Sequence, residues 1–362
     1  MKLIKLFDPI IDKNEEKAIL RTMKSGFWAS GAGTGQVEKF ENKFKKYTDA
    51  NCCVAVNSGT AALHLAFSLF DIKNKEVIIP SLSFASTAHA VIYNGGKPIF
   101  ADVNKNTLCI DPDDVRKKIT KKTKLIVPVH FGGMVCDLKE LLNISNVFDI
   151  NIVDDAAHAA GATFDRKKIG SIGDATCFSF HPVKNVAMPG GGLIALNNKN
   201  SKQEESLLKS LRWCGISNRR GFNYDIKHLG WNYYMNEFSA SIGIEQLKKL
   251  DKSNKKRRKI AGKYFENITT DSKMPLMNNC SYHLYWILVT NRNKFMKKMI
   301  ENNVETGIHY SPIHKMEFYN SKTKLKITEK ISKEIVSLPI HPNLTENDVD
   351  KIIKLTNKFS NI

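Results

Sequence analysis

The sequence lacks any long apolar run, and this limits where the protein can act. No stretch of the 362 residues approaches the roughly 20 consecutive apolar residues of a membrane-spanning helix. The N-terminal letters MKLIKLFDPIIDKNEEK become charged before the apolar core of a secretory signal could form. No internal repeat or low-complexity linker interrupts the chain. We therefore expect a soluble, cytoplasmic protein that does not associate with membranes.

Paired cysteines are also missing. The seven cysteines are odd in number and scattered, and no C-x-x-C spacing occurs. This pattern excludes a zinc ribbon, a thioredoxin-like redox pair and a small disulfide scaffold. We expect buried, reduced thiols and no metal site.

Acidic residues are scarce relative to basic ones. The chain has 55 Lys and Arg against 36 Asp and Glu, a formal net charge of +19. Such a charge suits a nucleic-acid binder or a protein that handles anionic small molecules. The lysines are spread almost evenly, and the dense run at 255–259 is typical of a solvated helix face. Because no basic reading motif occurs, we expect no nucleic-acid partner.

What the chain does have is a regular alternation of apolar runs and helical patterns. Apolar residues at helical spacing predict a helix over 60–70 and another before the first strand. Five apolar runs predict buried strands, at 52–56, 76–80, 98–103, 124–131 and 150–155. This order is typical of an α/β fold with a mostly parallel central sheet, whose ligands lie beyond the carboxyl ends of the strands.

The pattern changes near residue 236. From there the sequence predicts a long helix, then strands near 284–289 and 304–309 and helices near 293–302 and 347–357. We expect two domains. The large domain covers 1–245, with an N-terminal arm over 1–12, and 246–362 holds the linking helix and a smaller α/β domain.

Two charged side chains follow predicted strands of the large domain. Asp155 ends the strand at 150–155, and Lys184 lies in a polar turn that a glycine-rich segment follows. A lysine in such a turn can lose enough solvation to lower its pKa and act as an amine nucleophile. The alternative for Lys184 alone is a solvated surface lysine, of which the chain has many.

Two further strand ends offer an anion site and an aromatic ring. Ser58, Gly59 and Thr60 enter a helix, where hydroxyls and free amides form a cup for an anion. Phe84 could cover a flat ring. Taken singly, these residues fit an ordinary N-cap and a core phenylalanine equally well. Together with the amine and the carboxylate, they meet the needs of pyridoxal phosphate: a lysine, a partner for the pyridine nitrogen and a phosphate site.

The motifs around these residues resemble those of a known family. They include the segments IIPSLSFASTAHAVIYNGGKPIFADV, VDDAAHAAGATFDRKKIGSIGDATCFSFHPVKN, LGWNYYMNEFSASIGIEQLKKLD and VSLPIHPNLTENDVDKI. The SFHxxKN segment with DAAH upstream is the most specific of them. The chain is similar, nearly end to end, to the DegT/DnrJ/EryC1/StrS sugar aminotransferases. That resemblance implies a fold-type I, aspartate aminotransferase-like architecture and pyridoxal phosphate, alternating with pyridoxamine phosphate, as cofactor.

The resemblance also implies a role for each matching position near the cofactor ring. Lys184 would bind the cofactor covalently, and Asp155 would be the partner of the pyridine nitrogen. His158 would lie near the ring oxygen. Gly59 and Thr60 would hold the phosphate.

Five more positions carry over from the same motifs. Ser179 would complete the phosphate site, and Phe84 would lie against the ring. Asn232 matches the asparagine that reaches the phosphate of a neighbouring subunit, which implies a homodimer with shared active sites. His309 and His314 match a C-terminal stretch near the substrate.

The implied reaction is transfer of an amino group from an amino acid, by resemblance L-glutamate, to a keto sugar linked to a nucleotide diphosphate. Retention of Lys184 favours transamination, because dehydratase relatives carry histidine there. Two departures bear on the substrate: Pro189-Gly190 replaces the usual Gly-Glu, and Tyr234 replaces the usual arginine. The alternatives are a keto-cyclitol aminotransferase, a dehydratase-type relative and a regulatory protein that binds pyridoxal phosphate without turnover.

Overall fold

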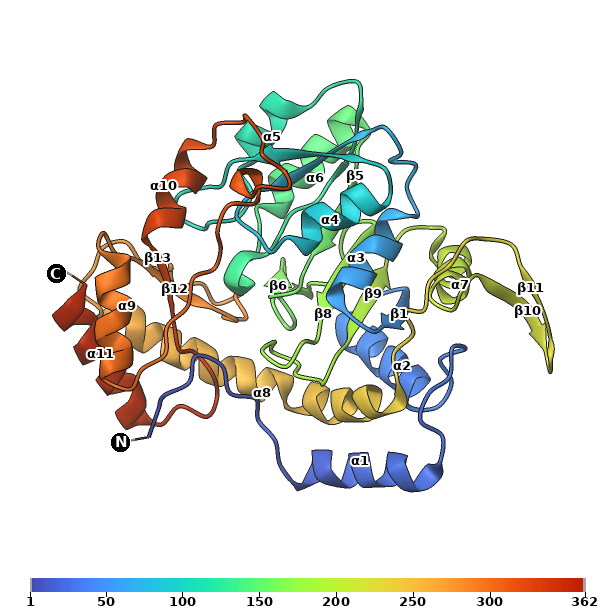
Figure 1. The fold of residues 1–362 in the computed structure, drawn as a ribbon, viewed down its shortest axis with the longest axis horizontal. Coiled ribbons are helices and arrows are strands. Elements are labelled where there is room, and N and C mark those ends of the chain that lie inside the picture. The colour runs from blue at the N-terminus through green and yellow to red at the C-terminus, as the bar shows by residue number, and fades with distance from the viewer. Residues whose placement is uncertain (1, 361–362) are drawn as a thin grey trace.

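A seven-stranded sheet forms the centre of the molecule (Figure 1). The computed structural model describes residues 2–360. Met1, the first residue of the predicted large domain, and residues 361 and 362, the last of the predicted small domain, lie outside the described residues. The strands are β1 (Cys52–Val56), β2 (Glu76–Pro80), β3 (Lys97–Ala101), β4 (Thr123–Ile126), β5 (Asn151–Asp155), β8 (Ala175–Ser179) and β9 (Gly192–Leu196). Their order is β1-β9-β8-β5-β4-β2-β3, and only β9 runs antiparallel to its neighbours. The predicted mostly parallel α/β sheet is confirmed.

Helices cover both faces of this sheet, so its strands are buried on each side. One face carries α3 (Gly59–Phe67), α4 (Ser86–Tyr93) and α7 (Ser201–Leu211). The other carries α2 (Gln36–Thr48), α5 (Pro112–Lys118), α6 (Leu138–Phe148) and part of α8 (Glu237–Asn267). Neighbouring residues of β2 divide between the two cores: Ile78 packs on one side, and Val77 and Ile79 on the other. The continuous apolar runs in the sequence have this physical cause.

The predicted strands at 52–56 and 76–80 match β1 and β2, whereas the one at 124–131 was too long. Strand β4 ends at Ile126, and the chain then turns through Pro128 into a short 3-10 helix, η1 (Phe131–Gly133). Gly132 and Gly133 both have positive φ there, at 63° and 91°. Residues 127–131 are buried although they lie outside the strand, so the apolar character of this segment reflects burial in a turn.

A smaller unit follows α8. It contains β12 (Tyr285–Leu288), α9 (Arg292–Glu301), a 3-10 turn η2 (Ile313–Lys315), α10 (Lys326–Glu334), β13 (Ile335–Leu338) and α11 (Glu346–Phe359). The predicted helices at 293–302 and 347–357 and the strand at 284–289 are confirmed. The strand predicted at 304–309 was wrong: only single bridges form, at Val304 and Gly307. The antiparallel partner of β12 is β13, which the sequence analysis missed.

Helix α8 runs through both predicted domains (Figure 1). Helix α1 (Lys13–Ser25) lies along it, and the buried Glu15 carboxylate accepts hydrogen bonds from Gln246 and Lys249 of α8. The predicted boundary between residues 245 and 246 falls within α8. The division into two domains stays a prediction.

A two-stranded hairpin extends from the body of the molecule beyond α7 (Figure 1). Its strands are β10 (Ile216–Arg220) and β11 (Asn223–Ile226), and Phe222 at its tip is 99% exposed. A second small hairpin joins β6 (Thr163–Phe164) to β7 (Lys167–Lys168). Across residues 2–360, the structure has no helix with the length and apolar character that crossing a membrane requires.

Candidate active site

The predicted site residues gather in one cavity of about 340 Å³ at the carboxyl ends of β1, β5 and β8. Seven of the ten predicted positions line it: Gly59, Thr60, Phe84, Asp155, His158, Ser179 and Lys184. A parallel sheet brings the ends of strands that are distant in sequence to a single edge, which is where such folds bind ligands. The cavity is therefore the candidate active site.

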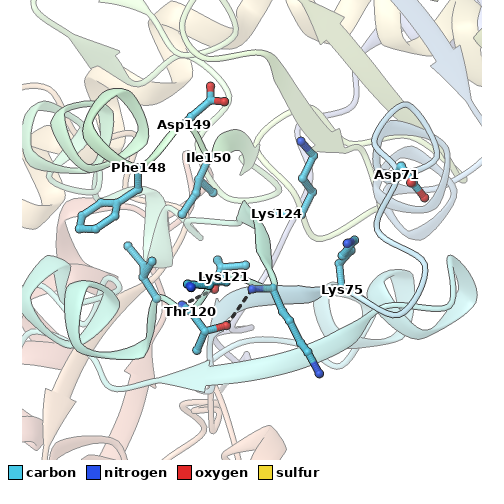
Figure 2. Close-up of a pocket in the computed structure, with 11 residues that line it drawn as sticks. Asp71, Lys75, Thr120, Lys121, Lys124, Phe148, Asp149 and Ile150 are labelled. Carbon is cyan, nitrogen blue, oxygen red and sulfur yellow. Dashed lines mark hydrogen bonds between the residues drawn. The ribbon is translucent and has the colours of Figure 1, made fainter.

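A larger depression, of about 810 Å³, lies at the opposite edge of the sheet (Figure 2). It is lined by residues that precede β2, β4 and β5, among them Lys75, Lys121, Lys122 and Asp149. These side chains are surface groups at the amino ends of the strands. The depression holds none of the predicted site residues, so size alone does not identify the site.

The N-terminus of α3 forms one wall of the cavity. Ser58 caps the helix by accepting a hydrogen bond from the Ala61 amide at 3.1 Å. The first amides of a helix have no acceptor within it, and the helix dipole favours an anion there. A Cβ added at Gly59 would lie 2.7 Å from the Ser179 Cβ, so only glycine lets the helix approach β8 this closely. The Thr60 hydroxyl lies 2.7 Å from that of Ser86.

Asp155 is the buried carboxylate of the cavity. The Thr87 hydroxyl donates to it at 2.8 Å and the Ala157 amide at 3.2 Å. Burial raises its pKa, although these donors and the nearby Lys184 oppose the shift. Asp154 has the opposite orientation, 3.6 Å from His130 and away from the cavity lining, because neighbouring side chains of a strand point to opposite faces.

Lys184 places its amine in the same cavity, on the loop after β8. Burial lowers the pKa of this amine to about 8, and Asp155 opposes part of that shift. The next residue, Asn185, fixes the loop by donating at 3.0 Å to both the Asn254 side chain and the Ser281 carbonyl. A substantial share of the amine is therefore neutral, and nucleophilic, near physiological pH.

His158 and two aromatic residues close the cavity. The His158 Nδ1 accepts a hydrogen bond from the Gly132 amide at 3.2 Å, which puts the proton of the neutral ring on Nε2. Nε2 lies 3.1 Å from the Tyr310 hydroxyl. Burial holds the His158 pKa well below its usual value, so the ring is neutral. The Phe84 ring lies 6.1 Å from that of Tyr310 at the solvent side.

Three predicted positions do not line the cavity of their own chain. Asn232 is exposed, in the segment between β11 and α8, where its carbonyl accepts from Asn57. His309 is hydrogen-bonded to the Ser337 hydroxyl at 2.9 Å. His314 is fully buried, and its Nδ1 lies 2.6 Å from the Ser81 hydroxyl. The predicted substrate contacts of the two histidines stay predictions.

The sequence analysis missed three side chains that the structure brings to this site. Thr87 orients Asp155, Tyr310 contacts His158, and the His283 Nε2 lies 3.5 Å from the Lys184 Nζ. Thr87 follows Phe84 by three residues in a quoted segment, and Tyr310 lies between His309 and His314 in the matching C-terminal stretch, whereas His283 lies in no segment quoted above. Position within a motif was therefore an available signal for Thr87 and Tyr310 but not for His283.

The cavity fits pyridoxal phosphate. The helix N-terminus suits a phosphate, and Gly59 lets this helix end lie directly against Ser179. The buried Asp155 suits a protonated pyridine nitrogen, and Lys184 supplies a free amine. Fold and site together define a pyridoxal phosphate-dependent aminotransferase of the aspartate aminotransferase-like class.

Comparison with known proteins gives the family. The model of the DegT/DnrJ/EryC1/StrS aminotransferase family matches residues 9–356, and the chain belongs to this family. It is 34% identical to the spore coat polysaccharide biosynthesis protein SpsC of Bacillus subtilis, over 96% of this chain and 94% of that protein. It is 33% identical to a dTDP-3-amino-3,6-dideoxy-alpha-D-galactopyranose transaminase of Aneurinibacillus thermoaerophilus, over 96% and 95%.

The solved structures agree on the fold and the cofactor. The Streptococcus pneumoniae protein Spr1654 in its PMP form superposes with a TM-score of 0.93 at 26% identity, covering 99% of this chain and 98% of that one. The same protein has also been solved in a PLP form. The predicted fold-type I architecture and the predicted cofactor are confirmed.

Proposed function

We propose that this enzyme transfers an amino group from L-glutamate to the keto group of a sugar linked to a nucleotide diphosphate, for amino-sugar or surface polysaccharide synthesis. The observation that carries the proposal is the Lys184 amine, with a pKa near 8, in one cavity with the buried Asp155. The similarity to a dTDP-sugar transaminase supports the substrate class. A keto-cyclitol substrate has less support, because that relative is named for a nucleotide-linked sugar.

Each residue of the cavity has a task in this reaction. When bound, pyridoxal phosphate supplies an electron sink that stabilises negative charge at the substrate carbon. Asp155 would keep the ring nitrogen protonated, and Thr87 and the Ala157 amide fix its carboxylate. Lys184 would act first as general base and then as general acid, moving a proton between the substrate carbon and the cofactor. The N-terminus of α3 with Ser179 would hold the phosphate, and Phe84 would cover the ring.

The proposed enzyme is a cytoplasmic homodimer with shared sites. The side chain of Asn232 is exposed in its own chain, as a residue that reaches a partner's phosphate must be. All seven cysteines are free, which suits a reducing compartment.

The experiment that tests the role of Lys184 uses the Lys184→Ala variant. It should bind cofactor without a borohydride-trappable link and lose essentially all transamination. Lys168→Ala, which removes a lysine outside the cavity, is the control. It should keep both the borohydride-trappable link to the cofactor and the transamination activity. Turnover by Lys184→Ala at near the unmodified rate would refute the assignment of the nucleophile.

A panel of NDP-3-keto and NDP-4-keto sugars tests the substrate class. With glutamate as donor, mass spectrometry of the products should show amination of at least one member. If only keto-cyclitols gained nitrogen, the keto-cyclitol alternative would replace this proposal. If none of the amino donors tried bleached the visible absorbance of the bound cofactor, a regulatory role without turnover would follow.

A further inference from the structure

A stack of rings lies beside the Lys184 amine, and none of its members belongs to the catalytic set above except His158. The His283 ring lies 4.4 Å from that of His158 and places its Nε2 3.5 Å from the Lys184 Nζ. Phe7 also stacks on His283, with ring centres 5.5 Å apart and planes 17° apart. His283 is buried, so its neighbours restrict the rotation of its ring.

The N-terminal segment that carries Phe7 is fixed to the smaller unit of the structure. Ile4 exchanges backbone hydrogen bonds of 2.9 Å with Asn303 and Glu305. The Leu6 amide donates to the Glu305 carboxylate at 2.9 Å. Phe7 itself packs edge-on against His309, with ring centres 5.8 Å apart. These contacts hold the Phe7 ring over His283 although the two residues are far apart in sequence.

The charges around the amine decide what His283 can do. The negative charge of Asp155 raises the pKa of Lys184, and the positive charge of Lys184 lowers the pKa values of His158, His283 and His309. Burial and the nearby Lys184 hold the pKa of His283 well below its usual value, as do His158, His309 and Arg257. His283 is therefore a neutral imidazole, and a neutral ring nitrogen can accept a hydrogen bond from an ammonium group.

We propose that His283, held in place by Phe7, is a positioning residue that accepts a hydrogen bond from the Lys184 ammonium and so sets the share of the amine that is protonated. The inference deepens the proposed function and rests on it, because the protonation state of Lys184 matters only if Lys184 is the reacting amine. The proton stays on the lysine, and no bond to carbon forms or breaks at His283.

The direction of the effect follows from this arrangement. An acceptor facing the ammonium stabilises the charged form and raises the pKa of the amine, opposing the desolvation that lowers it. Replacing His283 by phenylalanine keeps an aromatic ring for Phe7 but removes the acceptor. The share of neutral amine at a given pH should rise.

The test measures the Lys184 titration directly in the full-length protein, both without cofactor and loaded as the pyridoxamine form, in which the lysine amine is free. Trace acetic anhydride labels neutral amines, and mass spectrometry follows acetylation of Lys184 from about pH 6 to about pH 10. The variants are His283→Phe, His283→Gln and Phe7→Leu. The control is His89→Phe, because His89 also stacks on an aromatic ring, Tyr319, at 5.7 Å and 21°, but does not face the amine.

The titration midpoint should fall by about one pH unit in His283→Phe, as expected for loss of a hydrogen bond to a charged group. The midpoint should fall less in His283→Gln, because the amide oxygen can still accept a hydrogen bond from the ammonium group. The midpoint should also fall in Phe7→Leu, by less than in His283→Phe. It should not change in His89→Phe.

An unchanged or higher midpoint in His283→Phe would overturn the proposal. An equal fall in His283→Gln would do the same, because packing rather than an acceptor would then explain it. An unmoved Phe7→Leu would remove Phe7 from the proposal. If His283→Phe does not fold, His283→Gln and Phe7→Leu still give the sign of the shift. Absence of a borohydride-trapped link at Lys184 would instead refute the proposed function, which this titration does not measure.

Discussion

Burial shifts the two charged groups of the cavity toward their neutral forms. It lowers the pKa of Lys184 to about 8 and raises that of Asp155, because desolvation disfavours a charge of either sign. Their mutual attraction opposes both shifts, and Thr87 further stabilises the carboxylate. The site thus holds a reactive amine near a buried carboxylate, whose charged form a cationic group would stabilise. A protonated pyridine nitrogen is such a group.

Replacing Asp155 tests this electrostatic role. Asp155→Asn keeps the shape of the side chain but cannot hold the ring nitrogen protonated. We expect the activation free energy to rise by about 3 kcal/mol, which lowers kcat roughly a hundredfold. The cofactor should still be attached to Lys184. Thr87→Val, which removes one hydrogen-bond donor to Asp155, should raise the activation free energy by about 1 kcal/mol. Single-turnover kinetics measures both, and an unchanged kcat in Asp155→Asn would point to a different carboxylate.

The pKa of Lys184 predicts how the protein without cofactor captures pyridoxal phosphate. Below about pH 8 the amine is protonated and cannot attack, so the rate should rise about tenfold per pH unit and level off above the pKa. Stopped-flow absorbance measures the rate, and Nα-acetyl-lysine under the same conditions corrects for titration of the cofactor. A rise that continues to the ordinary lysine pKa, 10.5, would contradict the buried position of the amine.

Residues within short motifs could be predicted from sequence, and residues joined only by folding could not. Asp155 and Lys184 each follow a strand end, and the family resemblance implied their roles. His283 is 99 residues from Lys184, and Tyr310 is 152 from His158. These contacts form only when the smaller unit packs on the strand ends, and no periodicity in the chain encodes that approach.

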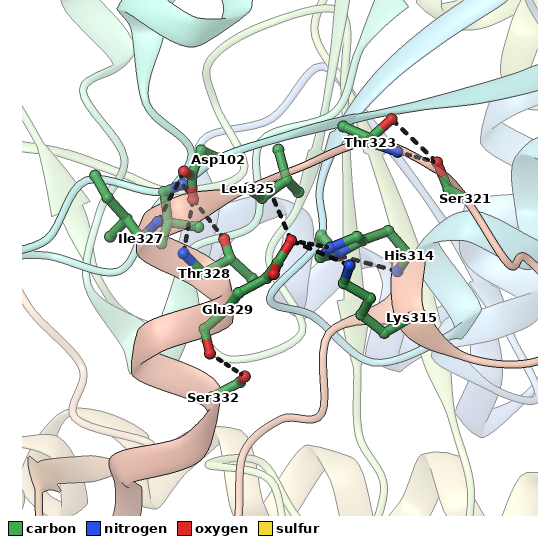
Figure 3. Close-up of polar contacts among 12 residues, drawn as sticks. Asp102, His314, Lys315, Ser321, Thr323, Leu325, Ile327, Thr328, Glu329 and Ser332 are labelled. Carbon is green, nitrogen blue, oxygen red and sulfur yellow. Dashed lines mark hydrogen bonds and ion pairs between the residues drawn. The ribbon is translucent and has the colours of Figure 1, made fainter.

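At the scale of elements, a carboxylate from the central sheet caps a helix of the smaller unit (Figure 3). Asp102, just after β3, accepts hydrogen bonds from the Ile327 and Thr328 amides and the Thr328 hydroxyl at the start of α10, at 3.0, 2.8 and 2.7 Å. A local N-cap residue usually does this. The helix was absent from the sequence analysis, and its cap comes from 225 residues away. Local signals could not have shown it.

Removing this cap should loosen α10. Asp102→Ala leaves the first amides of the helix without their acceptor, and we expect the free energy of unfolding to fall by about 2 kcal/mol. Urea unfolding followed by circular dichroism measures the change. Asp350→Asn, an exposed carboxylate on α11, is the matched control and should lose almost nothing. Equal stability of Asp102→Ala and the unmodified protein would show that the cap contributes nothing measurable.

At the scale of the whole molecule, the described chain presents features that its own cavity does not use. The hairpin β10–β11 extends from the body, and its exposed apolar side chains include Phe222, Tyr224 and Ile226. Asn232 follows this hairpin and is also exposed. Exposed apolar surface beside a residue assigned to a neighbour's phosphate site is what a shared-site homodimer predicts.

If Asn232 completes the phosphate site of the partner subunit, each chain alone has too few donors for the cofactor. Loss of one hydrogen bond to a charged acceptor costs about 1.5–3 kcal/mol, roughly ten- to a hundredfold in affinity. Asn232→Ala should therefore loosen the cofactor more than it slows the chemistry, and cofactor should be lost on dilution as dimers separate. Equilibrium dialysis over a dilution series measures this. Cofactor retention that did not depend on protein concentration would contradict it.

Mixing two variants that are each inactive at low cofactor concentration tests the shared site itself. A hybrid dimer of Lys184→Ala and Asn232→Ala has one site with both defects and one site with neither, because each site takes its lysine from one chain and its asparagine from the other. Activity should partly reappear when the subunits exchange, at a cofactor concentration too low to support Asn232→Ala alone. Mass spectrometry of differently tagged chains establishes the exchange. If hybrids form and activity stays absent, Asn232 acts within its own chain, and its exposed position in the structure needs another explanation.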